Sequence, residues 1–190
     1  MRKESKNLQQ EKIILGIDPG TNFLGYGIIK VQGKAIDLLD VGVLKINSKE
    51  DLGIKLKTIF FEIIRLINLH HPDHLAIESQ FFGNNVQSML KLGKAQGVAI
   101  AAALSRDIPF TEYPPKKIKQ SITGNGNASK EQVAGMLKNL LQVKELPDNF
   151  DATDGLATAV CHHYQENSMG AGKKYAGWKA FINEQPKRLK

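Results

Sequence analysis

Residues 13–18 of the chain read Ile-Ile-Leu-Gly-Ile-Asp, and Pro19-Gly20 follow directly. An apolar run that ends in an acid and a turn is typical of a buried strand. Residues 24–31 and 36–46 have the composition of two further strands, joined by a turn at Gln32-Gly33-Lys34. Because the connections are short, we expect these three strands to form an antiparallel meander.

Helices and strands alternate in the rest of the chain. Ser48 and Asp51 have the spacing of a capping box, and the helix they introduce should end at His71-Pro72. The further expected elements are a strand over 74–78, a helix over 84–104, a strand over 109–113, a basic segment over 116–121, a Gly-Asn-Gly-Asn loop over 124–127, a helix over 129–141 and a last helix from Pro147 to about Glu166. This order predicts an α/β fold with a mixed five-stranded sheet, three antiparallel strands followed by two right-handed crossovers.

Length and composition exclude several classes of protein. The 190 residues suit one domain, and 42% hydrophobic and 24% charged residues are ordinary globular values. The longest apolar stretch, residues 98–104, is far below the ~20 residues of a membrane span. We see no signal peptide, and the one cysteine, Cys161, cannot form an internal disulfide. We therefore expect a cytoplasmic protein with a disordered N-terminal tail over 1–12, one domain over 13–167, and a basic, mobile tail over 168–190.

The chain carries 26 Lys and Arg against 19 Asp and Glu, a formal net charge of +7. A pI near 9.4 favours a polyanionic partner, of which nucleic acid is the commonest, although basic residues also simply solvate surfaces. The basic side chains gather in two regions: Lys91, Lys94, Arg106, Lys116, Lys117, Lys119, Lys130 and Lys138, and then Lys173, Lys174, Lys179, Lys187, Arg188 and Lys190.

Four acids stand where a core residue is expected. Asp18 and Glu78 each end an apolar strand, and Asp151 and Asp154 share one face of the last helix, a face that continues with apolar residues. Taken singly, each has an ordinary explanation: Asp18 could bond turn amides, Glu78 could be solvated, and Asp151 could favour the helix dipole. Gathered at one edge of the sheet, they would repel one another unless cations neutralised them. Carboxylates suit Mg²⁺ or Mn²⁺, and two such ions ~3.5–4 Å apart can hold a scissile phosphate.

Four blocks of the sequence are similar to one known family. The blocks are ILGIDPGTNFLGYGII at 14–29, LAIESQFF at 75–82, KLGKAQGVAIAAAL at 91–104 and DATDGLATAVCHH at 151–163. In this order and spacing they resemble the bacterial Holliday-junction resolvase family RuvC. The resemblance runs from about Ile13 to Gln165. The two ends of the chain, residues 1–12 and 169–190, lie outside it.

The resemblance implies an RNase H-like fold, a homodimer, and Mg²⁺-dependent nicks in two opposing strands of a four-way DNA junction, during recombination and repair. It implies two ions per active site, with Mn²⁺ as a substitute, and RuvA and RuvB as partners. The family's catalytic and metal-binding acids fall on Asp18, Glu78, Asp151 and Asp154, and its essential lysines on Lys119 and Lys130. The expected DNA contacts are Phe81, Lys116, Lys117, Lys119 and Lys130.

Several features stay open on sequence grounds. Phe81 or Phe82 could stack on a base or plug the core. Gly93 and Gly97 permit close approach of a helix, either from a partner subunit or from the chain's own sheet. His162 and His163 lie about 16 Å along the helix from Asp151, too far to share its metal, and we expect packing or surface roles for them.

Three other functions compete with a nuclease. The Gly-Ile-Asp-Pro-Gly-Thr stretch at 16–21 also resembles the phosphate loop of sugar-kinase and actin-like ATPases, but 190 residues cannot supply their second half-domain. A binding-only junction protein would gain nothing from four acids beside phosphates. The related family of shorter RNase H-like resolvases is the third, and the 91–104 block and the helix with two aspartates favour RuvC over it.

Overall fold

The computed structural model describes residues 11–80 and 85–171, and for residues 167–171 the backbone alone. Its elements are β1 (Glu11–Asp18), β2 (Phe23–Gln32), β3 (Ala35–Lys45), α1 (Leu52–His70), β4 (His74–Glu78), α2 (Val86–Leu104), β5 (Phe110–Tyr113), α3 (Pro115–Thr123), α4 (Lys130–Leu141) and α5 (Phe150–Ala171). The expected tails, residues 1–12 and 168–190, fall largely outside the described residues, although β1 already begins at Glu11.

The five strands form one sheet in the order β3-β2-β1-β4-β5. β1 pairs antiparallel with β2, and β2 with β3, whereas β1–β4 and β4–β5 are parallel. The predicted α/β fold, with three antiparallel strands followed by two parallel ones, is confirmed. β1 lies in the middle of the sheet, as its continuous apolar run indicated.

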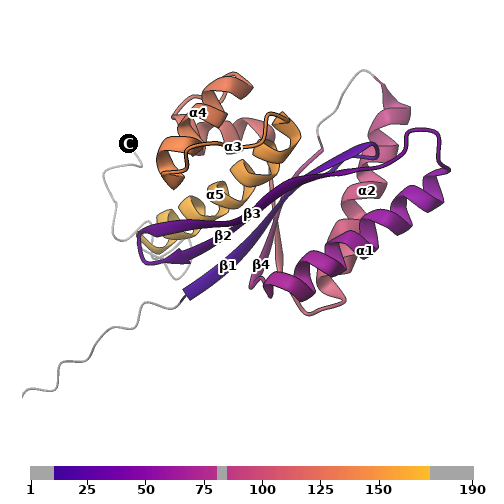
Figure 1. Cartoon of the computed structure of the whole chain (residues 1–190), viewed down its shortest axis with the longest axis horizontal. Coiled ribbons are helices and arrows are strands. Elements are labelled where there is room, and N and C mark those ends of the chain that lie inside the picture. Colours follow the sequence, from indigo (N-terminus) through magenta and orange to yellow (C-terminus); the bar gives the residue numbers. More distant parts are fainter. Residues whose placement is uncertain (1–10, 81–84, 172–190) are drawn as a thin grey trace, which may run out of the picture.

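Helices cover both faces of the sheet (Figure 1). On one face α1 and α2 pack over a core that includes Leu15, Ile17 and Leu75, and on the other α3, α4 and α5 cover Ile14 and Ile29. Successive residues of β1 thus enter opposite cores, because side chains alternate along a strand. Both cores are anchored on the strand that ends in Asp18.

Close backbone contact, in addition to side-chain packing, seats α5 on the sheet. A Cβ atom added to Gly25 would lie 1.7 Å from the carbonyl oxygen of Asp151, and one added to Gly16 would lie 2.3 Å from that of Gly155. Gly16 and Gly27 are paired across β1 and β2, so the glycines form a bare patch on which the helix rests. This close approach fixes the first turns of α5 over the carboxyl end of β1.

The structure corrects three local predictions. The basic segment over 116–121 is a helix, α3, which begins with Pro115 at its first position and buries Ile118 and Ile122. The capping box at Ser48 is wrong, because Asp51 itself caps α1 and accepts a hydrogen bond from the Gly53 amide at 2.7 Å. The last helix begins at Phe150 rather than Pro147.

Within the described part of the chain, no helix is long and apolar enough to cross a membrane.

Candidate active site

The acids expected to converge lie at one edge of the sheet. Asp18 is the last residue of β1 and Glu78 the last of β4, and these strands are parallel neighbours with Ile17 opposite Ile77. Asp151 and Asp154 approach from the first turns of α5, above the same edge. Carboxylate oxygens of Asp18, Asp151 and Asp154 all lie within 4.8 Å of one another. Residues more than 130 positions apart thus form one acidic cluster.

The electrostatic consequences are large. Burial raises the pKa of Asp18 to about 8, and the neighbouring Glu78, Asp154 and Asp151 add to the effect. Burial also raises the pKa of Glu78 to about 7, with a further contribution from Asp154. Each group holds its proton because burial, and then the negative charges nearby, make the ionised form unfavourable. Without cations, the cluster is therefore partly protonated at neutral pH.

Asn149, which the sequence analysis did not single out, holds Asp151 in place. Its side-chain oxygen accepts a hydrogen bond from the Asp151 amide at 2.9 Å, and its carbonyl accepts one from the Ala152 amide at 3.2 Å. These bonds satisfy free amides at the start of α5, which is how an Asn commonly caps a helix. An Asn two residues before an aspartate is the sequence signal for this cap.

The two lysines expected in the site, Lys130 and Lys119, come from α4 and α3. Lys130, the first residue of α4, donates a hydrogen bond to Asp154 Oδ2 at 2.6 Å. Burial lowers the pKa of Lys130, but the bond to Asp154 and the charges of Asp151 and Asp18 outweigh this and raise it. The Ser129–Gln132 capping box, which spans Lys130, fixes the start of this helix. Lys130 therefore offers a fixed positive charge beside the carboxylates.

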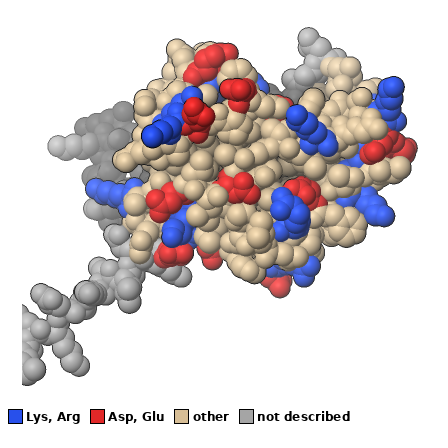
Figure 2. Space-filling view, in the orientation of Figure 1, with Lys and Arg blue, Asp and Glu red and all other residues tan. Residues whose placement is uncertain are grey.

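Lys119, on α3, lies close enough to Glu78 to lower the pKa of that carboxyl, and its ammonium donates to the Ala128 carbonyl at 2.9 Å. Lys116 and Lys117 are exposed on the same helix. Phe81 lies outside the described residues, so its expected contact with DNA stays a prediction. The face of the molecule in Figure 2 shows basic and acidic side chains interspersed, so the excess positive charge is not concentrated there.

The donor set fits a hard divalent cation. All the ligand atoms in the acidic cluster are carboxylate oxygens, which are the ligands of Mg²⁺ and Mn²⁺. The raised pKa values of Asp18 and Glu78 indicate a concentration of negative charge that such ions would relieve. The residues therefore fit the metal that the sequence predicts.

A second set of possible ligands, His74, His162 and Glu166, lies at the opposite edge of the sheet. The rings of His74 and His162 stack with centroids 4.0 Å apart and planes inclined by 20°. His162 is buried, in line with the packing role expected for it. It was missed as part of a cluster because His74 lies almost ninety residues earlier in the chain.

Comparisons with known proteins agree with this geometry. The family model described as crossover junction endodeoxyribonuclease RuvC matches residues 14–162. The chain is 56% identical over 187 residues to such an enzyme from Christiangramia forsetii, covering 98% of this chain and 97% of the relative. It is 53% identical to one from Bacteroides fragilis, covering 95% and 97%.

Solved structures give the same answer. The RuvC of Thermus thermophilus in complex with a Holliday junction substrate superimposes with a TM-score of 0.78 at 32% identity, covering 84% of this chain and 96% of that one. The yeast mitochondrial resolvase Ydc2, at 16% identity and a TM-score of 0.56, shares the fold. Sequence, sheet order and the position of the acids agree, and the chain belongs to the RuvC family of crossover junction endodeoxyribonucleases.

Proposed function

We propose that the chain is a divalent-metal-dependent endonuclease that resolves four-way DNA junctions by paired nicks in opposing strands, in homologous recombination and DNA repair. The observation that carries this proposal is the meeting of Asp18, Asp151 and Asp154 within 4.8 Å, beside Glu78, in a chain of the RuvC family. A binding-only protein would pay an electrostatic cost for this cluster next to phosphates without gaining anything from it.

The roles of the residues follow from their positions. Asp18, Glu78, Asp151 and Asp154 would hold two Mg²⁺ ions, with Mn²⁺ as a substitute, and these ions would supply charge neutralisation at phosphorus and a more acidic water. In the proposed reaction, water adds to phosphorus and the bond to the 3′ oxygen breaks. The products are a 5′-phosphate and a 3′-hydroxyl. The buried cluster keeps the attacking water and the phosphate in one place.

Lys130 and Lys119 would complete the site. Lys130 holds Asp154 in a single orientation through the 2.6 Å hydrogen bond, and its charge lies where negative charge develops on the phosphate. Lys119 lies on the Glu78 side of the cluster, where it would contact the DNA backbone. Two lysines on different helices, α3 and α4, thus lie next to the acids.

A homodimer is supported by the exposed face of α2. Gly93 and Gly97 do not pack on the chain's own sheet, because a Cβ added to either meets no atom of the described residues within 4 Å. The same face exposes Val86, Leu90 and Leu104, each more than half exposed. An apolar stripe with glycines at its centre suits close approach of a second copy about a two-fold axis.

Gly93→Glu should convert the dimer to monomers in analytical ultracentrifugation; unchanged sedimentation would place the interface elsewhere.

Two active sites on such a dimer would meet two strands only where the arms of the DNA splay, which gives selectivity for a junction. The exposed Lys116 and Lys117 would add backbone contacts, and Phe81 would stack on an unpaired base at the crossover. RuvA and RuvB would deliver the junction, and the protein would act on the chromosome in the cytoplasm.

Phe81→Ala should reduce the fluorescence change of a 2-aminopurine placed at the crossover; an unchanged signal would remove Phe81 from this role.

The direct test is incubation of the full chain with a synthetic four-way junction and with a linear duplex of the same sequence, with and without Mg²⁺. We expect paired, symmetric nicks in the junction only when Mg²⁺ is present, and no cleavage of the duplex. Equal cleavage of the two substrates, or cleavage in EDTA, would contradict the proposal.

A further inference from the structure

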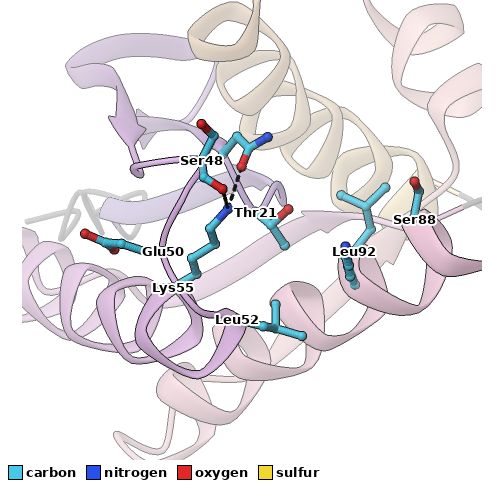
Figure 3. Close-up of a pocket in the computed structure, with 9 residues that line it drawn as sticks. Thr21, Ser48, Glu50, Leu52, Lys55, Ser88 and Leu92 are labelled. Atoms are coloured by element: carbon cyan, nitrogen blue, oxygen red, sulfur yellow. Dashed lines mark hydrogen bonds between the residues drawn. The ribbon is translucent and has the colours of Figure 1, made fainter.

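A polar pocket of about 420 Å³ is lined in part by the turn between β1 and β2, which directly follows Asp18. Its walls come from that turn, from the connection between β3 and α1, and from the first half of α2 (Figure 3). The lining residues are Thr21, Asn22, Ser48, Glu50, Leu52, Lys55, Ser88, Lys91 and Leu92. Only Pro19 and Gly20 separate Asp18 from the first of these residues.

Lys55 gives the pocket its character. The side chain projects from the first turn of α1, and the residue is only 7% exposed. Its ammonium donates to Asn22 Oδ1 at 2.8 Å and to the Ser48 carbonyl at 3.0 Å, the two bonds drawn in Figure 3. Both acceptors are neutral, and among the described residues no carboxylate lies within 4.0 Å of the ammonium.

A buried cation without a counter-ion is unusual. Burial of an ammonium group is costly unless it is paired, and almost all buried lysines have a charged partner. Two neutral hydrogen bonds leave the third N–H of Lys55 and its full charge available. Glu50 is exposed at the rim and forms no ion pair with Lys55 within that distance. An anion in the pocket would supply the charged partner that the described residues do not.

The other polar groups around the pocket match a phosphate. Thr21, Ser48 and Ser88 contribute hydroxyl groups, and Figure 3 shows Ser88 on α2 across the pocket from Lys55. Lys91, also on α2, adds a second positive charge and forms no ion pair with a described residue. Hydroxyl donors and two ammonium groups are the donors that commonly contact the DNA backbone.

We propose that this pocket binds a backbone phosphate of the DNA strand that is cleaved, next to the scissile phosphate, with Lys55 and Lys91 as its ligands. The inference rests on the proposed function and adds to it a second anchoring point. Asp18 precedes the turn between β1 and β2, and Thr21 and Asn22 of that turn line the pocket, so a strand crossing the turn would meet both. Lys55 would also fix the turn through Asn22, so that occupation of the pocket positions the phosphate held at Asp18.

The test combines protein variants with changes in the DNA. Uncharged methylphosphonates replace, one at a time, the three phosphates on each side of the scissile one, and junction binding by the full chain is measured in EDTA. We expect one position to weaken binding of the wild-type protein about tenfold, the value of a charge-assisted hydrogen bond. Lys55→Met and Lys91→Met should each bind more weakly, and the same methylphosphonate should cost them less than twofold more.

Lys57→Met is the matched control. Lys57 is exposed on the same helix as Lys55, and its substitution removes the same charge. Lys57→Met should keep the full tenfold loss of binding at the sensitive methylphosphonate position. Lys55→Met should, in addition, lower the slope of log Kd against log salt by about one. Because Lys91 is exposed, its variant will fold even if Lys55→Met does not, and it decides the outcome alone in that case. Equal penalties at every position in the wild type, Lys91→Met and Lys57→Met would overturn the inference.

Junction cleavage by the wild-type protein with Mg²⁺ is measured alongside and separates the two proposals. If the wild type cleaves the junction but no methylphosphonate position depends on Lys55 or Lys91, only the phosphate pocket is refuted. If the wild type does not cleave the junction, the proposed function itself fails.

Discussion

The two ends of α5 make an instructive contrast. At its start, Asp151 and Asp154 join Asp18 at one edge of the sheet; about three turns later, His162 and Glu166 join His74 near the opposite edge. Both groups have ligand atoms within 4.8 Å of one another, and distance alone does not separate them. What separates them is how each cluster is neutralised by the rest of the chain.

The charge of the histidine cluster is already balanced, although the buried Nε2 of His162 has no hydrogen-bond partner among the described residues. Glu166 accepts a hydrogen bond from Lys12 at 2.6 Å. Burial raises the pKa of this carboxyl, but the bond and the charges of His162 and Lys12 together outweigh burial and lower it. Burial, reinforced by His74, lowers the pKa of His162 to about 4, so its ring is neutral and stacked, and Tyr113 is 2.8 Å from its Nδ1. A metal lies in the plane of the imidazole that binds it, so two stacked rings do not share an ion without turning.

The acidic cluster is not satisfied. Lys130 is the one cation in an ion pair with it among the described residues, against four carboxylates. The contrast indicates that a functional metal site is recognised by uncompensated charge, not by the proximity of possible ligands.

The largest effect should come from the acids. Asp18→Asn keeps the shape of the side chain but removes a charged ligand, and loss of the metal's charge stabilisation, several kcal/mol, should slow junction cleavage about a thousandfold or more. Junction binding should persist. Glu166→Gln is the matched control at the other end of α5, and its cleavage rate should stay within about twofold of wild type. Single-turnover assays with Mg²⁺ measure both rates; a similar loss in the two variants would erase the contrast.

A smaller effect should come from the lysine that partly compensates the acids. Lys130→Met removes the donor to Asp154 Oδ2 and a positive charge near the phosphate, so we expect cleavage to slow roughly a hundredfold. Lys144→Met removes one charge from an exposed position between α4 and α5 and should cleave at the wild-type rate. If Lys130→Met cleaves normally, the lysine only solvates the surface.

The smallest effect should be on stability. Because the pKa of Asp18 is raised to about 8 in the folded, metal-free chain, the folded state keeps a proton that the unfolded state loses above about pH 4. Stability should therefore fall as the pH rises from 4 to 8, and Asp18→Asn should relieve this loss. In EDTA, the melting temperature of the variant should exceed that of wild type by several degrees at pH 8.5 and by little at pH 4.5. A difference independent of pH would show that Asp18 is not electrostatically strained.

The sheet was predictable because its strands are apolar runs bounded by turns, and Asp18 and Glu78 were predictable because each ends such a run. The helix α3 was not, because its two buried residues, Ile118 and Ile122, stand among lysines and polar residues. The convergence of Asp151 with Asp18 depends on backbone contact at Gly25, whose partner on α5 is not evident in the sequence. Lys55 looked like any helical lysine, since nothing local indicates that two distant loops bury it.

The central claim is that the acidic edge holds divalent ions and the histidine edge does not. Anomalous diffraction from a crystal soaked in Mn²⁺ tests it directly. The account predicts manganese peaks among the carboxylates of Asp18, Glu78 and Asp151, and none between His74 and His162. A peak at the histidines alone, or no peak at either edge, would contradict it.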